Sequence, residues 1–316
     1  MAHTYGDERI AAWLSENGYH PRSPAHGSAS CLFLLDDLIE TSDRFRTAAQ
    51  DGDVVYREDY TVGSGQSRWN TDLVVGPPAD GTEGDPTEGD RPILEAEPGE
   101  VWLAIDAKSV MTEHGKARRN RQRDINSFAD IMHRHYPGAV TGGVLLINAA
   151  ERFKSPLRDE GDVTVHDNID RLVSETVDIF RDIERSDGDI SPNVDGVGCV
   201  VVKHTNTDDG APTRLVTDPP APGEDDPVNY RRFVELLAST FDSRFLSGDP
   251  PDLEALRSAE SVQNRLNQEV VALAGLAHSI GNALETGEVG RDDVEQLHER
   301  VAALDATVDR IEEEFL

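Results

Sequence analysis

The chain has 316 residues, with 61 acidic against 30 basic side chains, a formal net charge of −31 and only 6% aromatic residues. This charge repels nucleic acid over most of the surface, so any nucleic-acid site must be a local exception. No run of 18 apolar residues occurs, which excludes a membrane-spanning helix.

The acidic excess runs along the whole chain, and arginine is heavily preferred to lysine. This pattern is typical of halophilic proteins, which work in a salty cytoplasm where high salt screens long-range repulsion. High charge with low hydrophobicity also marks disordered chains. We favour the salt-adapted interpretation because strand and helix patterns fill most of the length.

Cysteine usage and the N-terminus both favour a cytoplasmic location. Cys31 and Cys199 lie far apart, each in an apolar run, so we expect reduced core residues. The first eight residues lack the basic and then apolar pattern of a signal peptide.

The N-terminal part predicts two helices and a strand. Residues 7–17 form a short amphipathic helix, and a longer one starts near Ser28, with apolar positions continuing to Phe45. This second helix carries the acidic residue Glu40. Residues 53–62 alternate as a strand and carry Glu58.

Two further strands each carry a carboxylate. Residues 71–76 are an apolar strand that opens with Asp72, and residues 101–110 are a second one containing Asp106 and Lys108. Between them, residues 79–99 are mostly Pro, Gly, Asp and Glu, which predicts a flexible acidic insertion.

Asp106 and Lys108 are two positions apart, so their side chains leave the strand on one face. A buried charge costs several kcal/mol unless it is paired or binds a metal. Two carboxylates and a lysine on neighbouring strands are the constellation expected of a metal-dependent phosphodiesterase.

The next helix, residues 116–135, begins with the most basic stretch of the chain. Five of its first eight residues are basic and none is acidic. We expect it to bind DNA phosphates, against the alternative that its arginines pair with surface acids. The candidate DNA-binding residues are Lys116, Arg118, Arg119, Arg121, Gln122 and Arg123.

Further apolar periodicities extend the predicted sheet. We expect strands at 139–148 and 196–204, helices at 167–185 and 230–246, and an acidic, proline-rich loop at 208–226. Residues 1–248 would then form one α/β domain with a mixed central sheet flanked by helices.

Asp72 followed by Asp106-Ala107-Lys108 on the next strand resembles the PD-(D/E)XK nuclease superfamily, which includes most type II restriction endonucleases. The resemblance covers roughly residues 30–150, and Thr71 stands where the family often has proline. It implies a restriction-endonuclease-like core with the order helix, strand, strand, strand, helix, strand, as predicted here.

The resemblance also implies a catalytic site. Asp72, Asp106 and the backbone carbonyl of Ala107 would bind Mg²⁺ or Mn²⁺, because hard oxygen ligands suit these ions. Lys108 would hold the attacking water. In the family a helix before the strands sometimes adds an acid, for which Glu40 is a candidate. Glu58 on its strand is another.

The expected activity is therefore metal-dependent hydrolysis of DNA by a restriction-type endonuclease. The alternatives are a DNA-repair nuclease, or a catalytically silent nuclease fold that binds nucleic acid or protein. No nucleotide cofactor is expected, because no P-loop or Gly-x-Gly-x-x-Gly fingerprint occurs.

The C-terminal part, residues 249–316, has a different pattern. Apolar residues recur every three or four positions in two stretches separated by a glycine-bounded segment at 286–290, which predicts an antiparallel α-helical hairpin or coiled coil. The hairpin could pack on its own domain, but we favour pairing with a second subunit, giving a homodimer.

Overall fold

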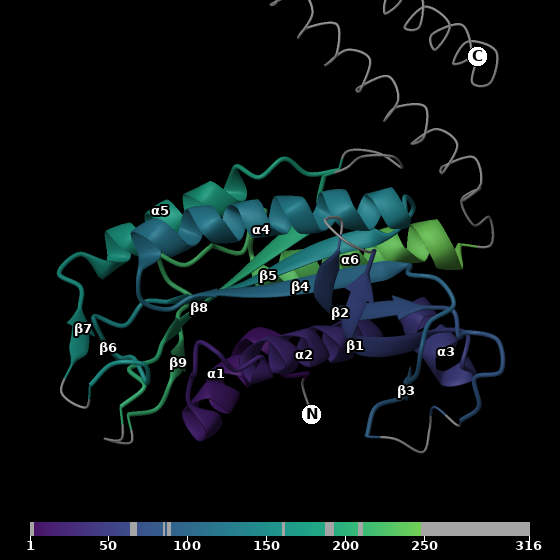
Figure 1. The fold of residues 1–316 in the computed structure, drawn as a ribbon, viewed down its shortest axis with the longest axis horizontal. Helices are drawn as coiled ribbons and strands as arrows, with labels where there is room; N and C mark the ends of the chain where they lie inside the picture. Colours follow the sequence, from purple (N-terminus) through teal and green to yellow (C-terminus); the bar gives the residue numbers. More distant parts are fainter. Residues whose placement is uncertain are drawn as a thin grey trace, which may run out of the picture. The chain divides into compact units, whose positions relative to one another are not determined.

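A computed structural model describes residues 3–63, 68–84, 86, 90–159, 162–186, 193–207 and 211–247 (Figure 1). These residues belong to one unit, Met1–Pro251. The expected C-terminal hairpin at 249–316 and the domain boundary at 248 lie outside the described residues.

The described part begins with three helices, and four strands follow them before the next helix. The helices are α1 Gly6–Asn17, α2 Ala25–Thr41, α3 Asp43–Asp51, α4 His114–His135, α5 Ile169–Arg181, α6 Tyr230–Phe241 and a π-helical turn Asp242–Leu246. The strands are β1 Val55–Val62, β2 Trp69–Gly76, β3 Leu94–Glu95, β4 Leu103–Val110, β5 Val140–Asn148, β6 Arg152–Lys154, β7 Val163–Val165, β8 Gly196–Lys203 and β9 Arg214–Leu215.

The centre of the fold is a mixed sheet with the strand order β3-β1-β2-β4-β5-β8-β9. β1, β2 and β4 are antiparallel neighbours, whereas β4, β5 and β8 run parallel. Helices α4 and α5 cover one face, and α1, α2 and α6 pack against the other (Figure 1). The predicted α/β architecture, a mixed sheet flanked by helices, is confirmed.

The parallel strands β5 and β8 are mainly apolar and buried because helices cover both of their faces. All nine residues of β5 are buried. On the α4 face, Phe128 and Met132 pack against Val74 and Ala104. On the other face, Gly198 of β8 lets α6 approach the sheet closely. A Cβ at this position would lie 2.5 Å from the Phe233 ring.

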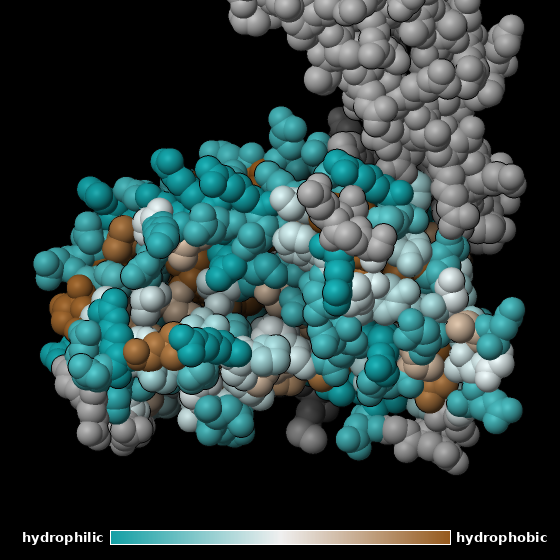
Figure 2. All heavy atoms as spheres, in the orientation of Figure 1, coloured by the Kyte–Doolittle hydropathy of each residue, from teal (hydrophilic) through white to brown (hydrophobic). Residues whose placement is uncertain are grey.

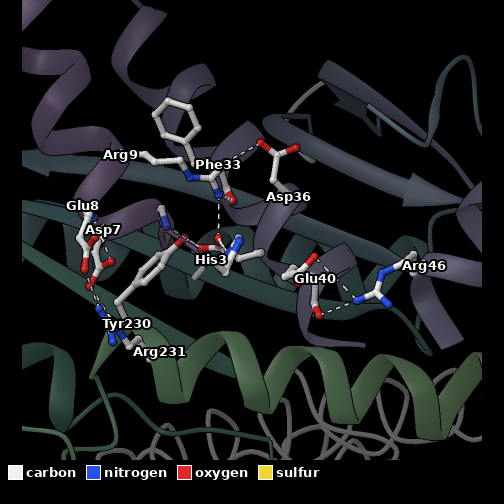
Figure 3. A network of polar contacts seen from close by, with 12 residues as sticks. His3, Asp7, Glu8, Arg9, Phe33, Asp36, Glu40, Arg46, Tyr230 and Arg231 are labelled. Carbon is white, nitrogen blue, oxygen red and sulfur yellow. Dashed lines mark hydrogen bonds and ion pairs between the residues drawn. The ribbon is translucent and has the colours of Figure 1, made fainter. Parts of the chain in front are cut away.

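The N-terminal helices are tied to α6 by a buried carboxylate. Asp37 of α2 is 0% exposed and accepts hydrogen bonds from Gly6 N, from Arg9 at 2.7 Å and from the Tyr230 hydroxyl at 2.8 Å. Figure 3 shows Arg9 and Tyr230 within this network. The Asp37 carboxylate therefore joins α1 and α2 to α6, which is far from both in the sequence.

The structure divides the second predicted helix in two. α2 ends at Thr41 and Ser42 starts α3, with its hydroxyl accepting from Phe45 N at 2.9 Å. The same hydroxyl donates to the Asp242 carboxylate. The helical spacing of apolar residues continues through Phe45. The periodicity therefore does not reveal the break at Ser42.

The predicted acidic insertion contains a short strand within its described residues. β3 pairs in parallel with β1, and Pro78 forms a bridge with Pro98. A further short hairpin, β6–β7, was not predicted, because strands of three residues are too short for an alternating pattern to emerge.

The face drawn in Figure 2 is mainly hydrophilic, with scattered hydrophobic residues. Among the described residues, the large hydrophobic side chains that are exposed are Leu157, Val165 and Leu236. No helix in the described part is both long and apolar enough to cross a membrane.

Candidate active site

The candidate site lies where β2 and β4 stop pairing through their backbones. Their ladder joins Leu73–Val75 to Leu103–Ile105. Beyond it, the Thr71 hydroxyl donates to the Ile105 carbonyl at 2.8 Å, and Asp72 Oδ2 accepts from Ala107 N at 2.7 Å. Two side chains of β2 thus replace backbone partners and hold Asp72 beside the Asp106 strand.

Asp106 and Lys108 meet on one face of β4, as their spacing predicts. Lys108 Nζ lies 2.6 Å from Asp106 Oδ1 and 3.4 Å from the Ala107 carbonyl oxygen. Asp106 is 0% exposed, and its Oδ2 has no hydrogen-bond partner among the described residues. One oxygen of a fully buried carboxylate is therefore left without a donor, an arrangement with a substantial energetic cost.

Electrostatics in the site favour the arrival of a cation. Burial raises the pKa of Asp72 and of Asp106, and the Lys108 ammonium opposes the rise at both. The Asp72 charge further raises the pKa of Asp106. Since one lysine faces two buried carboxylates, the ionised site carries net negative charge, which attracts a cation.

Glu58 belongs to the same cluster. It lies on β1, and the Ser28 hydroxyl at the start of α2 donates to its carboxylate. Burial and the nearby charges of Asp72, Asp106 and Glu58 together raise the pKa of the Cys31 thiol. Asp72 and Glu58 therefore both lie against the first turns of α2.

The structure does not bring Glu40 to this cluster. Gly27, near the start of α2, packs on Asp72, since a Cβ there would lie 3.7 Å from Oδ1. Glu40 is thirteen positions further along the helix, roughly 20 Å at the rise of an α-helix. Its carboxylate is exposed and lies 3.8 Å from Arg46 (Figure 3). Of the two acids considered, Glu58 lies nearer to the start of α2 than Glu40 does, but it forms no three-acid metal group with Asp72 and Asp106 in the described part of the chain.

The basic stretch forms the first turns of α4, but its side chains differ in their surroundings. Arg118 pairs with Glu175 of α5 at 2.6 Å, and Arg121 pairs with Asp124 at 2.7 Å. Gln122 is partly exposed. The basic side chains of this stretch that are exposed, and that have no acidic partner among the described residues, are Lys116, Arg119 and Arg123.

Sequence reasoning missed two residues of the cluster. Trp69 starts β2, and its ring lies 5.8 Å from Lys108 Nζ. Asp59 has a left-handed backbone, with φ of 53°, and its charge raises the pKa of Asp72. The β1–β2 register pairs Glu58 with Leu73 and Tyr60 with Thr71, which leaves Asp59 and Asp72 between these pairs. The sequence alone does not fix this register.

A large cavity lies elsewhere and takes in none of these residues. Its volume is about 760 Å³, and its lining includes Asp7, Tyr230 and Arg232. Two arginines of its lining pair with acids of the same lining, Arg231 with Asp7 at 3.8 Å and Arg232 with Asp225 at 3.7 Å. The cavity therefore does not coincide with the buried charges of the candidate site.

The donors present fit a hard divalent cation. Asp72, Asp106 and the Ala107 carbonyl are all oxygen ligands, and Asp106 Oδ2 lacks any other partner in the described part of the chain. Among the described residues, no three His, Cys, Asp or Glu side chains form a metal-binding group. A site here would thus rely on the backbone carbonyl and on water in addition to its two carboxylates.

No family model, curated protein or solved structure matches the chain.

Proposed function

We propose that the protein is a metal-dependent DNA endonuclease of the PD-(D/E)XK type, most simply a restriction-type enzyme. The observation that carries this proposal is the convergence of Asp72, Asp106 and Lys108 at the fork between β2 and β4. A buried acid with an unpartnered oxygen, beside a second acid and a lysine, has little value for stability alone.

The surrounding topology supports the same proposal. A helix, three strands each antiparallel to the next, a crossover helix and a parallel strand follow in order as α2, β1, β2, β4, α4 and β5. This is the order that the PD-(D/E)XK resemblance implies, with α3 added after α2 and the two-residue strand β3 added before β4. The crossover helix, which follows β4 in the chain, also carries the basic stretch.

Each residue then has a defined task. Asp72, Asp106 and the Ala107 carbonyl would hold Mg²⁺ or Mn²⁺, with Glu58 available as a further acid. When bound, the ion would lower the pKa of a water and stabilise charge on the scissile phosphate. Lys108 would orient the attacking water and add positive charge at the transition state. Lys116, Arg119 and Arg123 would contact neighbouring phosphates.

The decisive experiment is DNA cleavage by the full chain in high salt. We expect plasmid nicking or cutting with Mg²⁺ or Mn²⁺ and none with excess chelator. Lys108→Ala and Asp72→Asn should each reduce cleavage by about 100-fold or more while DNA binding persists. Lys203→Ala, which removes an exposed lysine from β8, is the matched control and should cleave as the parent does.

Three other outcomes would redirect the proposal. Cleavage that is unchanged in Lys108→Ala would place the active site elsewhere. DNA binding without cleavage under any divalent cation would favour a silent nuclease fold. Cleavage at a single sequence favours restriction, whereas sequence-independent nicking favours a repair nuclease.

A further inference from the structure

The Lys108 ammonium has three neighbours, and two of them have a second task. It contacts Asp106 Oδ1 at 2.6 Å and the Ala107 carbonyl at 3.4 Å, and it lies 5.8 Å from the centre of the Trp69 ring. Both oxygens belong to the set that would bind the metal. Lys108 therefore occupies positions that a divalent cation needs.

A divalent cation on Asp106 would repel the ammonium from that carboxylate. Lys108 must nevertheless stay beside the reacting phosphate if it is to orient the water. Of its three contacts, the face of Trp69 alone uses no metal-binding oxygen. The indole face attracts ammonium groups more strongly than a Tyr or Phe ring does.

We propose that Trp69 is a positioning residue that holds the Lys108 ammonium over its indole face when a metal ion occupies Asp106. This inference rests on the proposed function and assigns a role to a residue outside the Asp-Asp-Lys set. Trp69 acts through Lys108 and does not itself touch the substrate.

The local structure keeps the indole in place. Trp69 pairs with Val62 across the β1–β2 ladder, and its ring lies 6.4 Å from that of Phe128 in α4. The indole Nε1 is buried and is close enough to the Asp106 carboxylate for its N–H to lower the pKa of that carboxyl. A buried N–H beside a buried carboxylate ties Trp69 to the site, whereas Phe or Leu at this position would supply packing without a donor.

Two substitutions of Trp69 distinguish the attraction of its ring for the ammonium from its contribution to packing. Trp69→Phe retains an aromatic face with weaker attraction for a cation, and Trp69→Leu removes the face while remaining apolar. We expect kcat to fall about two- to threefold in Trp69→Phe and about tenfold in Trp69→Leu. KM for DNA should change less than about twofold in both, because the substrate does not touch Trp69.

Trp102→Leu is the matched control for loss of a large core side chain. Trp102 stacks on Phe245, with ring centroids 4.8 Å apart, away from Lys108. We expect it to lower the melting temperature but to leave kcat unchanged. If Trp102→Leu lowers kcat as much as Trp69→Leu does, or if Trp69→Leu keeps the parent kcat, Trp69 has only a packing role.

A second readout does not depend on cleavage. The chain has three tryptophans, so fluorine NMR of 5-fluorotryptophan protein should give three resonances, with the Trp69 signal assigned by its loss in Trp69→Phe. Mg²⁺ should shift this resonance in the parent but not in Lys108→Met. An equal shift in both proteins, or none in the parent, would overturn the inference.

The two readouts also distinguish the inference from the proposed function. A protein that cleaves no DNA but shows the Lys108-dependent shift retains the positioning role without the nuclease. A protein that cleaves DNA without that shift is a nuclease in which Trp69 does not position Lys108.

Discussion

At the scale of single residues, the chain buries two kinds of carboxylate. Asp37 is fully buried, but hydrogen bonds from Gly6, Arg9 and Tyr230 satisfy it. Asp106 is equally buried, and one of its oxygens has no partner among the described residues. Both carboxylates are buried, so burial does not distinguish them. The presence of hydrogen-bond donors distinguishes the structural Asp37 from the functional candidate Asp106.

This contrast gives a stability prediction for Asp37. Asp37→Asn retains the shape but removes the charge that faces Arg9, so we expect a loss of about 2–4 kcal/mol in the free energy of unfolding. Glu40→Gln, on the same helix and 56% exposed at its side chain, should change it by less than about 0.5 kcal/mol. Urea unfolding measures both, and equal effects would contradict a structural role for Asp37.

At the scale of elements, α4 presents two different surfaces. Its apolar residues Phe128 and Met132 cover the sheet, and its first turns carry the basic stretch. Acids of the protein's own surface already neutralise Arg118 and Arg121, as the alternative interpretation of this stretch held. The exposed basic side chains without an acidic partner among the described residues, Lys116, Arg119 and Arg123, are therefore the ones to test for DNA binding.

We expect the triple substitution of Lys116, Arg119 and Arg123 by alanine to weaken DNA binding. The slope of log K against log salt should decrease by about 0.9 for each phosphate that the variant no longer neutralises. Arg134→Ala at the other end of α4 is the control, since its side chain pairs with Asp130. Titration at several salt concentrations measures the slope.

The melting temperature of the triple variant should stay near that of the parent, because none of the three side chains has an acidic partner among the described residues. Unchanged binding by the triple variant, together with weakened binding by an Arg118→Ala, Arg121→Ala variant, would move the DNA contact to the paired arginines.

At the scale of the whole molecule, each chain carries one set of Asp72, Asp106 and Lys108. Breaking both strands of a duplex therefore needs two subunits or two successive encounters. The heptad pattern at 249–316 predicts that the C-terminal part supplies the second subunit.

Truncation after Gly248 tests this prediction. The truncated protein retains the π-helical turn and the stack of Phe245 on Trp102, so we expect it to fold. Light scattering should find a dimer for the full chain and a monomer for the truncated one. The monomer should nick one strand more readily than it breaks both. If both proteins are instead monomers, the C-terminal part does not pair subunits.

The sequence by itself determined the long strands of the sheet, the order of the main elements and the proximity of Asp106 to Lys108. These follow from short-range rules: apolar runs mark buried strands, and residues two apart on a strand share a face. The same rules located the basic turns of α4, because five cations in eight residues stand out in an acidic chain.

Only the tertiary structure decided which other groups join the site. Ser28 reaches Glu58, and Trp69 reaches Lys108, through contacts between elements far apart in the sequence. Glu40 and Glu58 both lay on predicted elements near the strands, but their distance from Asp72 depends on where α2 begins and how it crosses the sheet. Local periodicity carries no information on that crossing, because it follows from the packing of whole elements against one another.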